Sequence, residues 1–159
     1  MSYWQADVKK PSNFTFRQDS EVIDSFTGSY RWLSNFEPSV VTLDGQKYPT
    51  VEHAYQAAKT FDTEKRLVIA NLPFPGDAKK AGNKLDIRSD WENVKLEIME
   101  MLVREKFHFE PLRSKLLSTG TAQLIEGNWW QDVFWGVCKG QGKNHLGLIL
   151  MRVRSSLTT

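Results

Sequence analysis

The chain has little of several things that define whole classes of protein. Its single cysteine, Cys138, rules out an intrachain disulfide framework and a cysteine-based zinc cluster. Its three histidines, at positions 53, 108 and 145, lack metal-ligand spacing, so we expect no metal and no cofactor. The longest apolar run, "LGLILM", is too short to cross a bilayer, and "MSYWQADVKKPSNF" contains no apolar signal core. We therefore expect a soluble, cytoplasmic protein with no membrane contact.

The chain also lacks a large excess of either positive or negative charge. The 21 Lys and Arg residues against 19 Asp and Glu leave a net charge of +2, too even for a general nucleic-acid coat, although a local anion site fits. A length of 159 residues with 40% hydrophobic content suffices for one domain with its own core. What is plentiful is aromatic content, 12%. Aromatic rings fill cores but also form walls on which sugars and bases stack.

The order of local patterns predicts an α+β fold, a helix-rich single domain with a small antiparallel sheet. Residues 1–24 look like a weakly structured lead-in with a strand near 14–16. "SVVTLDGQKYP" predicts a hairpin that turns at Asp44-Gly45. Helices are expected over residues 50–61, 63–71, 77–85, 89–109 and 111–119, and from about 144 to the end.

Two of these helices carry clear start signals. Thr50 is expected to cap the first helix, and Ser89 with Glu92 forms a capping box for the long one. The apolar stripe of the long helix is expected at five positions: Trp91, Val94, Ile98, Met101 and Leu102.

The first helix sets an acid, a phenol, an amide and an amine on one face. Glu52, Tyr55, Gln56 and Lys59 are spaced i, i+3, i+4 and i+7. The buried stripe would then come from Ala54, Ala57, Ala58 and Phe61. The polar face is either the wall of an active site or solvated surface whose charges complement the helix dipole.

The stretch "GQGKNHLG" runs into the terminal helix, which is expected to begin near Asn144. Backbone N–H groups at a helix start, with Lys143 beside them, form an anion site, and the alternative is a flexible surface turn. The spacing is not that of a Walker A motif.

Other candidates each have two interpretations. Asp132 can enter a pocket or cap a turn, and Asn35 can bond a sugar hydroxyl or close a turn. His53 and His145 are more often ordinary histidines, so neither is assigned to catalysis. Four large rings are more than one core of this size hides, so some of them should stack on a ligand: Trp32, Phe36, Trp91 and Trp135.

A set of motifs in a fixed order carries a family resemblance. They are "LSNF", "DGQKYPTVEHAYQAAK", "W..VK..IM......KF", "L..LLSTG...LIEG", "D.FWG" and "GKNHLGLILMRVR". Residues 26–155 thereby resemble the YbiA-like family, also called NADAR domains, with residues 1–25 as the lead-in. The resemblance implies a helix-rich α+β fold, no metal, and N-glycosidase activity between ribose C1 and an exocyclic amino nitrogen.

Carried onto this chain, the resemblance implies Glu52, Lys59 and Asp132 as catalytic residues. Relatives often have Gly-Arg where this chain has Gly82-Asn83, so Lys84 or Arg88 would have to replace that arginine. With the helix face and this substitution included, the expected substrate-binding residues are Ser34, Asn35, Phe36, Tyr55, Gln56, Arg88, Trp91, Trp135, Gly136, Gly142, Lys143 and Asn144.

The implied substrate is a small molecule carrying ribose phosphate or ADP-ribose, with ADP-ribosylated DNA as a further substrate and no obligate protein partner. ADP-ribose on a guanine amino group is favoured. The alternatives are ribosylaminopyrimidine phosphates of the riboflavin pathway, and a non-catalytic module that reads ADP-ribose. An N-ribosylamine can break through an oxocarbenium-like C1 or through an opened-ring imine that a lysine exchanges. Glu52 as acid/base and Lys59 as the amine suit the second route.

Overall fold

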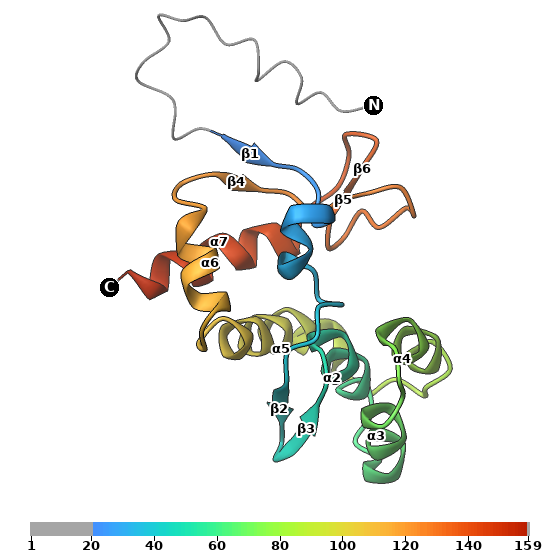
Figure 1. The fold of residues 1–159 in the computed structure, drawn as a ribbon. Helices are drawn as coiled ribbons and strands as arrows, with labels where there is room; N and C mark the ends of the chain where they lie inside the picture. The colour runs from blue at the N-terminus through green and yellow to red at the C-terminus, as the bar shows by residue number, and fades with distance from the viewer. Residues whose placement is uncertain (1–20, 159) are drawn as a thin grey trace, which may run out of the picture. The chain divides into compact units, whose positions relative to one another are not determined.

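The computed structural model describes residues 21–158 and has the helix-rich α+β fold predicted from the sequence (Figure 1). These residues form two compact units. The central unit is Arg31–Arg113, and the terminal unit combines the chain up to Tyr30 with the segment from Ser114 onward. The strand expected near residues 14–16 lies outside the described residues.

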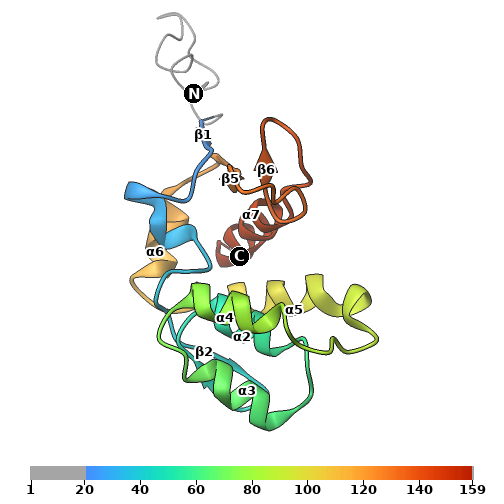
Figure 2. The same cartoon turned by 90° about the vertical axis from the view of Figure 1, so that its right-hand side faces the viewer.

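The central unit begins with the hairpin and then runs through four helices. Strands β2 (Val41–Leu43) and β3 (Gln46–Tyr48) pair antiparallel. Asp44 and Gly45 both have positive φ, as the favoured two-residue turn requires, so the predicted hairpin is confirmed. The helices that follow are α2 (Val51–Ala57), α3 (Thr63–Ala70), α4 (Pro75–Gly82) and α5 (Trp91–Lys106). Helix α2 packs against the other three (Figures 1 and 2).

Helix α2 starts as predicted but ends early and is buried throughout. The Thr50 hydroxyl accepts the N–H of His53 at 3.0 Å, which caps the helix. The helix ends at Ala57 rather than at residue 61, and all seven of its residues are buried. Phe61, expected in the buried stripe, is 64% exposed. The expected split into an apolar and a free polar face was therefore wrong, because α3, α4 and α5 enclose the helix from several sides.

Helix α5 begins at Trp91, and its predicted capping box is wrong. The N-cap is Asp90, whose side chain makes no capping hydrogen bond because its carboxylate binds Arg88 instead, at 2.6 Å. Met101, expected in the apolar stripe, is 47% exposed. The buried residues of the helix are Trp91, Met99, Leu102, Val103 and Lys106.

The terminal unit contains two short parallel strand pairs and the last helix. Strand β1 (Val22–Ile23) pairs with β4 (Gln123–Leu124), and β5 (Gly127–Asn128) pairs with β6 (Val137–Cys138). Of the three strand pairs within residues 21–158, β2–β3 alone is antiparallel, so the prediction of one small antiparallel sheet was incomplete. Strand β1 lies inside the expected lead-in. Helix α7 (His145–Leu157) completes this unit. The chain passes from one unit to the other within two helices, η2 (Gly28–Leu33) and α6 (Leu112–Ser118).

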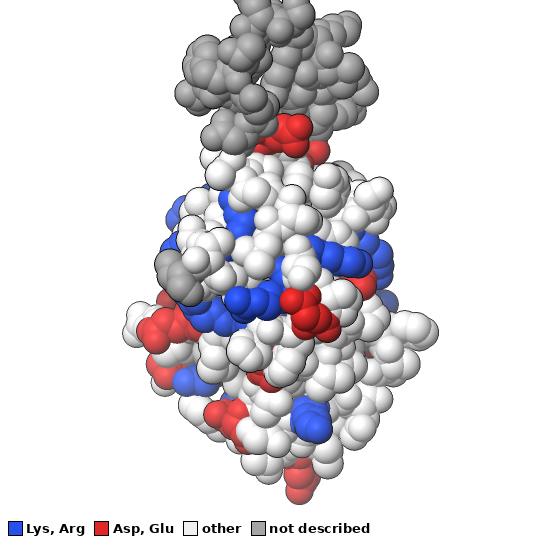
Figure 3. Space-filling view, turned by 60° about the vertical axis from the view of Figure 1, so that its left-hand side comes forward, with Lys and Arg blue, Asp and Glu red and all other residues white. Residues whose placement is uncertain are grey.

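The face drawn in Figure 3 carries Asp and Glu as well as Lys and Arg, and several of its Lys and Arg side chains lie side by side. Within residues 21–158, no helix is long and apolar enough to cross a membrane. In the same range, no three His, Cys, Asp or Glu side chains lie together in a way that could hold a metal ion.

Candidate active site

Glu52 and Gln56 form a buried pair on successive turns of α2. Glu52 is 8% exposed, and the Gln56 Nε2 donates to its Oε2 at 2.6 Å. The other side of the Gln56 amide rests on α4, where a Cβ added to Gly82 would overlap the Gln56 Oε1. Gly82 therefore leaves the space that the Gln56 side chain needs to hold the Glu52 carboxylate.

Lys59 lies two residues beyond the end of α2, with its backbone fixed on both sides. Its N–H donates to the Gln56 carbonyl at 3.2 Å, and its carbonyl accepts the Arg88 N–H at 2.8 Å. Its Nζ lies 5.9 Å from the centroid of the Tyr55 ring. The short helix therefore does not separate Lys59 from the residues with which it was predicted to share a face.

The electrostatic environment lowers the pKa of Lys59. Burial is the main cause, and the positive charges of Lys79 and Lys95 act in the same direction, whereas the Glu52 carboxylate opposes them. A lower pKa raises the fraction of neutral amine, which is the nucleophilic form. Lys79 and Lys95 were not singled out from the sequence. For Lys95 there was a signal, since it lies four positions after Trp91 on the same helix face.

Tyr55 and Trp91 form an aromatic pair beside this amine. Their ring centroids are 5.1 Å apart with planes tilted by 53°, and both residues are buried. Trp91 therefore belongs to the packed face of α5, as one of its two interpretations had it. That either ring contacts a substrate stays a prediction.

Arg88 contacts the segment that follows α2 through its side chain and its backbone. Its Nε and Nη2 bind the two carboxylate oxygens of Asp90 at 2.6 and 2.9 Å, and its guanidinium lies 4.0 Å from the centroid of the Phe61 ring. Its Nη1 also approaches the Ala58 carbonyl, at 3.4 Å. The hydrogen bond to Asp90 raises the pKa of Arg88. Phosphate binding by Arg88 stays a prediction. The contacts that Arg88 makes in the structure are with the main chain on either side of Lys59 and with Asp90 and Phe61.

The "LSNF" motif forms a turn that contacts the start of α2. The Ser34 Oγ accepts the Phe36 N–H at 3.1 Å, which closes the turn. The Asn35 carbonyl accepts the Glu52 N–H at 3.1 Å, and the Asn35 Nδ2 donates to the Met99 Sδ at 3.4 Å. The structure thus brings Ser34 and Asn35 together with Glu52, through the backbone.

The remaining candidates lie in the terminal unit, where Asp132 caps a turn. Its Oδ1 accepts the N–H groups of Phe134 and Trp135 at 3.1 and 2.9 Å. The Asn128 side chain accepts the Asp132 N–H and donates to the Asp132 carbonyl. The turn-capping interpretation therefore holds for Asp132, and its catalytic role stays a prediction.

The expected backbone anion site at the start of α7 is not open. The N–H groups of Asn144, His145 and Leu146 already donate to the carbonyls of residues 136, 134 and 135. The Asn144 side chain accepts the Glu126 N–H and donates to the carbonyl of residue 124. Lys143 is exposed, and its predicted contact with an anion depends on its side chain alone.

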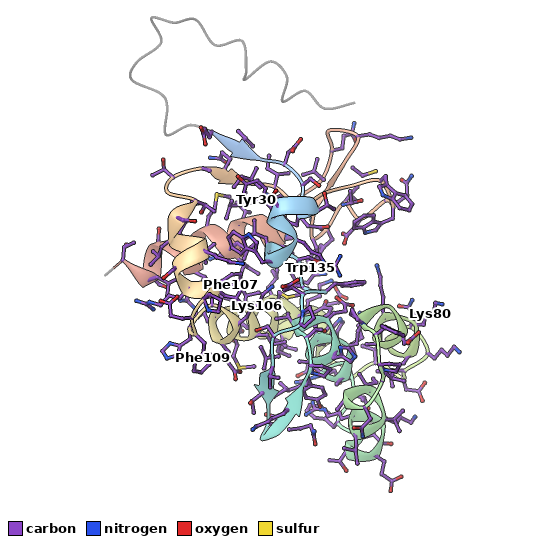
Figure 4. All side chains as sticks on the ribbon, viewed as in Figure 1. Tyr30, Lys80, Lys106, Phe107, Phe109 and Trp135 are labelled. Atoms are coloured by element: carbon purple, nitrogen blue, oxygen red, sulfur yellow. The ribbon has the colours of Figure 1, made fainter. Side chains whose placement is uncertain are left out.

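Two glycines beside this helix allow close packing of backbone on backbone. Gly142 has a φ of +147°, and a Cβ added there would overlap the carbonyl of Gly136. A Cβ on Gly136 would overlap the carbonyl of Glu126. Trp135, which is labelled in Figure 4 and lies next to Gly136, is half-buried. The centroid of its ring lies 4.9 Å from that of the Phe134 ring. Direct substrate contact by these residues stays a prediction.

The helix-rich α+β fold of this chain is also found in known proteins of similar sequence. The NMR structure of the Escherichia coli protein YbiA matches with a TM-score of 0.78 and 36% identity, over 89% of this chain and 86% of that one. The E. coli protein named N-glycosidase YbiA is 38% identical over 138 residues, 84% of this chain and 85% of its own length. A Vibrio vulnificus protein named as a riboflavin biosynthesis protein is 36% identical over 133 residues, which are 36% of its length. The NADAR domain model matches residues 15–158, and the chain belongs to this family.

Proposed function

We propose that this chain hydrolyses the bond between ribose C1 and an exocyclic amino nitrogen, with ADP-ribosylated guanine as its substrate. The broader activity, N-glycosidase, follows from its family and from YbiA, which it matches over most of both chains. The observation that carries the proposal is the half-buried Lys59, whose pKa is lowered beside Glu52. A neutral amine and a carboxyl group are what exchange of a base at an anomeric carbon requires.

The reaction proceeds through an imine. The lone pair of the exocyclic nitrogen opens the ribose ring, C1 becomes doubly bonded to that nitrogen, and Glu52 protonates the ring oxygen. The Lys59 amine then adds to C1, and the base leaves with its amino group, so that C1 is held as the Lys59 imine. Water, deprotonated by Glu52, adds to C1 and the bond to Lys59 breaks, which frees the sugar and restores the amine.

The positive charges around Lys59 support a phosphorylated substrate. Lys79 on α4 and Lys95 on α5 are both close enough to lower the pKa of Lys59. A phosphate or pyrophosphate placed among these amines would offset their mutual repulsion. We favour the guanine adduct, and Trp129 and Trp130 of the terminal unit, exposed at 81% and 43%, are rings on which the bases of a nucleic-acid substrate can stack. The riboflavin-related name of the Vibrio relative supports a second candidate, a ribosylaminopyrimidine phosphate.

The test is product analysis by mass spectrometry with both substrates in parallel, an oligonucleotide carrying ADP-ribosylguanine and a ribosylaminopyrimidine phosphate. Glu52→Gln and Lys59→Ala should abolish release of the base from whichever substrate is cleaved. Lys65→Ala, an exposed lysine of α3, is the matched control. Borohydride added during turnover should attach the sugar to Lys59. Cleavage at the wild-type rate by both folded variants would refute the assignment, and binding without turnover would favour a non-catalytic reader.

A further inference from the structure

Lys106, in the last turn of α5, is a fully buried lysine that the reaction does not use. Its side chain is 1% exposed, and its Nζ donates to the Ser34 carbonyl at 2.7 Å. The Nζ also lies 5.0 Å from the centroid of the Phe107 ring, next to it in Figure 4. Glu37 is the acidic group whose charge favours the ammonium. An ammonium in this position is costly to bury, so packing alone would be better served by an apolar side chain.

The carbonyl that Lys106 binds belongs to the turn of residues 34–37. The Ser34 carbonyl also accepts the Glu37 N–H at 3.1 Å, and the Ser34 hydroxyl accepts the Phe36 N–H. The turn therefore has its own closing bonds, and Lys106 adds a bond to it from α5. Met99 adds a second, because its Sδ accepts the Asn35 Nδ2.

The same turn holds the catalytic helix. The Asn35 carbonyl accepts the N–H of Glu52, one of the first-turn N–H groups of α2 that the helix itself leaves without a partner. Lys106 and Met99 are seven positions apart and project from one face of α5. A continuous set of hydrogen bonds therefore runs from α5 through residues 34–35 to the backbone of Glu52.

We propose that Lys106 is a positioning residue for the glycosidase reaction, holding the Ser34–Asn35 turn so that Asn35 fixes the first turn of α2 and the Glu52 carboxylate. The catalytic consequence rests on the function proposed above for Glu52, whereas the structural link to the Glu52 N–H does not. Burial lowers the pKa of Lys106 to about 7, so the ammonium costs the folded state free energy, and the stability of the fold is not what explains a lysine at this position.

The experiment compares Lys106→Met with Arg104→Met, a matched control that removes an exposed charge of the same helix. NMR measures hydrogen exchange at the Glu52 N–H and at the Ala58 N–H, which donates to Ala54 within the same region. Lys106→Met should speed exchange at Glu52 about tenfold relative to Ala58, and should lower kcat about tenfold while KM changes less than twofold. Arg104→Met should change neither quantity.

Met99→Leu removes the other hydrogen bond between α5 and this turn, the one from the Asn35 Nδ2 to the Met99 Sδ. It should also speed hydrogen exchange at the Glu52 N–H, to a smaller extent. A folded Lys106→Met variant with unchanged relative exchange at Glu52 would overturn the proposal, and so would faster exchange with unchanged kcat. If the wild type cleaves neither substrate, the proposed function fails, and the exchange measurement alone then decides whether Lys106 positions Glu52.

Discussion

Replacing Lys106 with methionine should make the protein more stable at low pH. The pKa of Lys106 is about 7 in the folded protein, against 10.5 ordinarily, because its side chain is buried. Between these values the unfolded chain binds a proton that the folded chain lacks, so wild-type stability rises with pH across that window. Below pH 7 both states are charged, and at about 1.4 kcal/mol per pH unit the buried charge costs the folded state about 5 kcal/mol.

Methionine removes this cost and loses the hydrogen bond to the Ser34 carbonyl, which is worth about 2 kcal/mol. That carbonyl still accepts the Glu37 N–H, so the substitution leaves it with a partner. The variant should therefore be about 3 kcal/mol more stable than the wild type at pH 6 and equally stable near pH 9. At pH 10, where little of the cost remains, it should be about 1 kcal/mol less stable.

Urea unfolding followed by tryptophan fluorescence at pH 6, 9 and 10 measures these differences. Arg104→Met removes an exposed charge from the same helix and should show a difference from wild type that hardly varies with pH. If Lys106→Met were less stable than wild type at pH 6, or if its difference did not change with pH, the argument from the buried charge would fail.

Further predictions concern Gly82, Lys59 and Asp132. Gly82→Ala should push the Gln56 amide away from Glu52, costing about 1–3 kcal/mol of stability, measured by urea unfolding, and lowering kcat. Labelling of Lys59 by an amine-reactive reagent, followed by mass spectrometry, should rise with pH and level off below pH 10.5. In Glu52→Gln the opposing charge is gone, so the pKa of Lys59 should fall further and the levelling should move to lower pH. Asp132→Asn keeps the oxygen that caps the turn, so activity retained by this variant would mean a structural role, and activity lost would mean proton transfer.

Gly76→Ala is the control for Gly82→Ala. Gly76 lies on the same helix, α4, and a Cβ added there would meet no atom within 4 Å. It should leave both stability and kcat close to wild type. Equal effects of the two alanine substitutions would mean that the contact with Gln56 is not what Gly82 protects.

The features that were predictable from the sequence depend on neighbours in the chain. The Asp44-Gly45 turn and the Thr50 cap each need residues within about four positions, and both are as predicted. The predicted capping box at Ser89 is wrong because the N-cap of α5 is Asp90, one residue later, and start signals in a sequence do not fix a helix boundary to a single residue.

The features that were missed depend on contacts between distant segments. Strand β1 pairs with β4 about a hundred residues away, and two-residue strands carry almost no periodic signal. Lys106 reaches across 72 positions to Ser34, and a lysine near a helix end is normally assigned to the surface. The sequence around Gly82 did not predict its contact with Gln56, because that contact forms only when α2 and α4 pack against each other.

In the proposed reaction, the interaction between Glu52 and Lys59 would let one pair of side chains supply both an acid and a nucleophile. An ionised Glu52 raises the pKa of Lys59, against the burial that lowers it. Protonating Glu52 removes this opposition, so the neutral carboxylic acid and the neutral amine favour each other, and one proton moved within the pair creates both reactive forms. Water excluded by a bound substrate would favour this neutral arrangement further, because desolvation penalises the ion pair. The Gln56 amide, which donates to Glu52 at 2.6 Å, holds the carboxyl group in place in either protonation state.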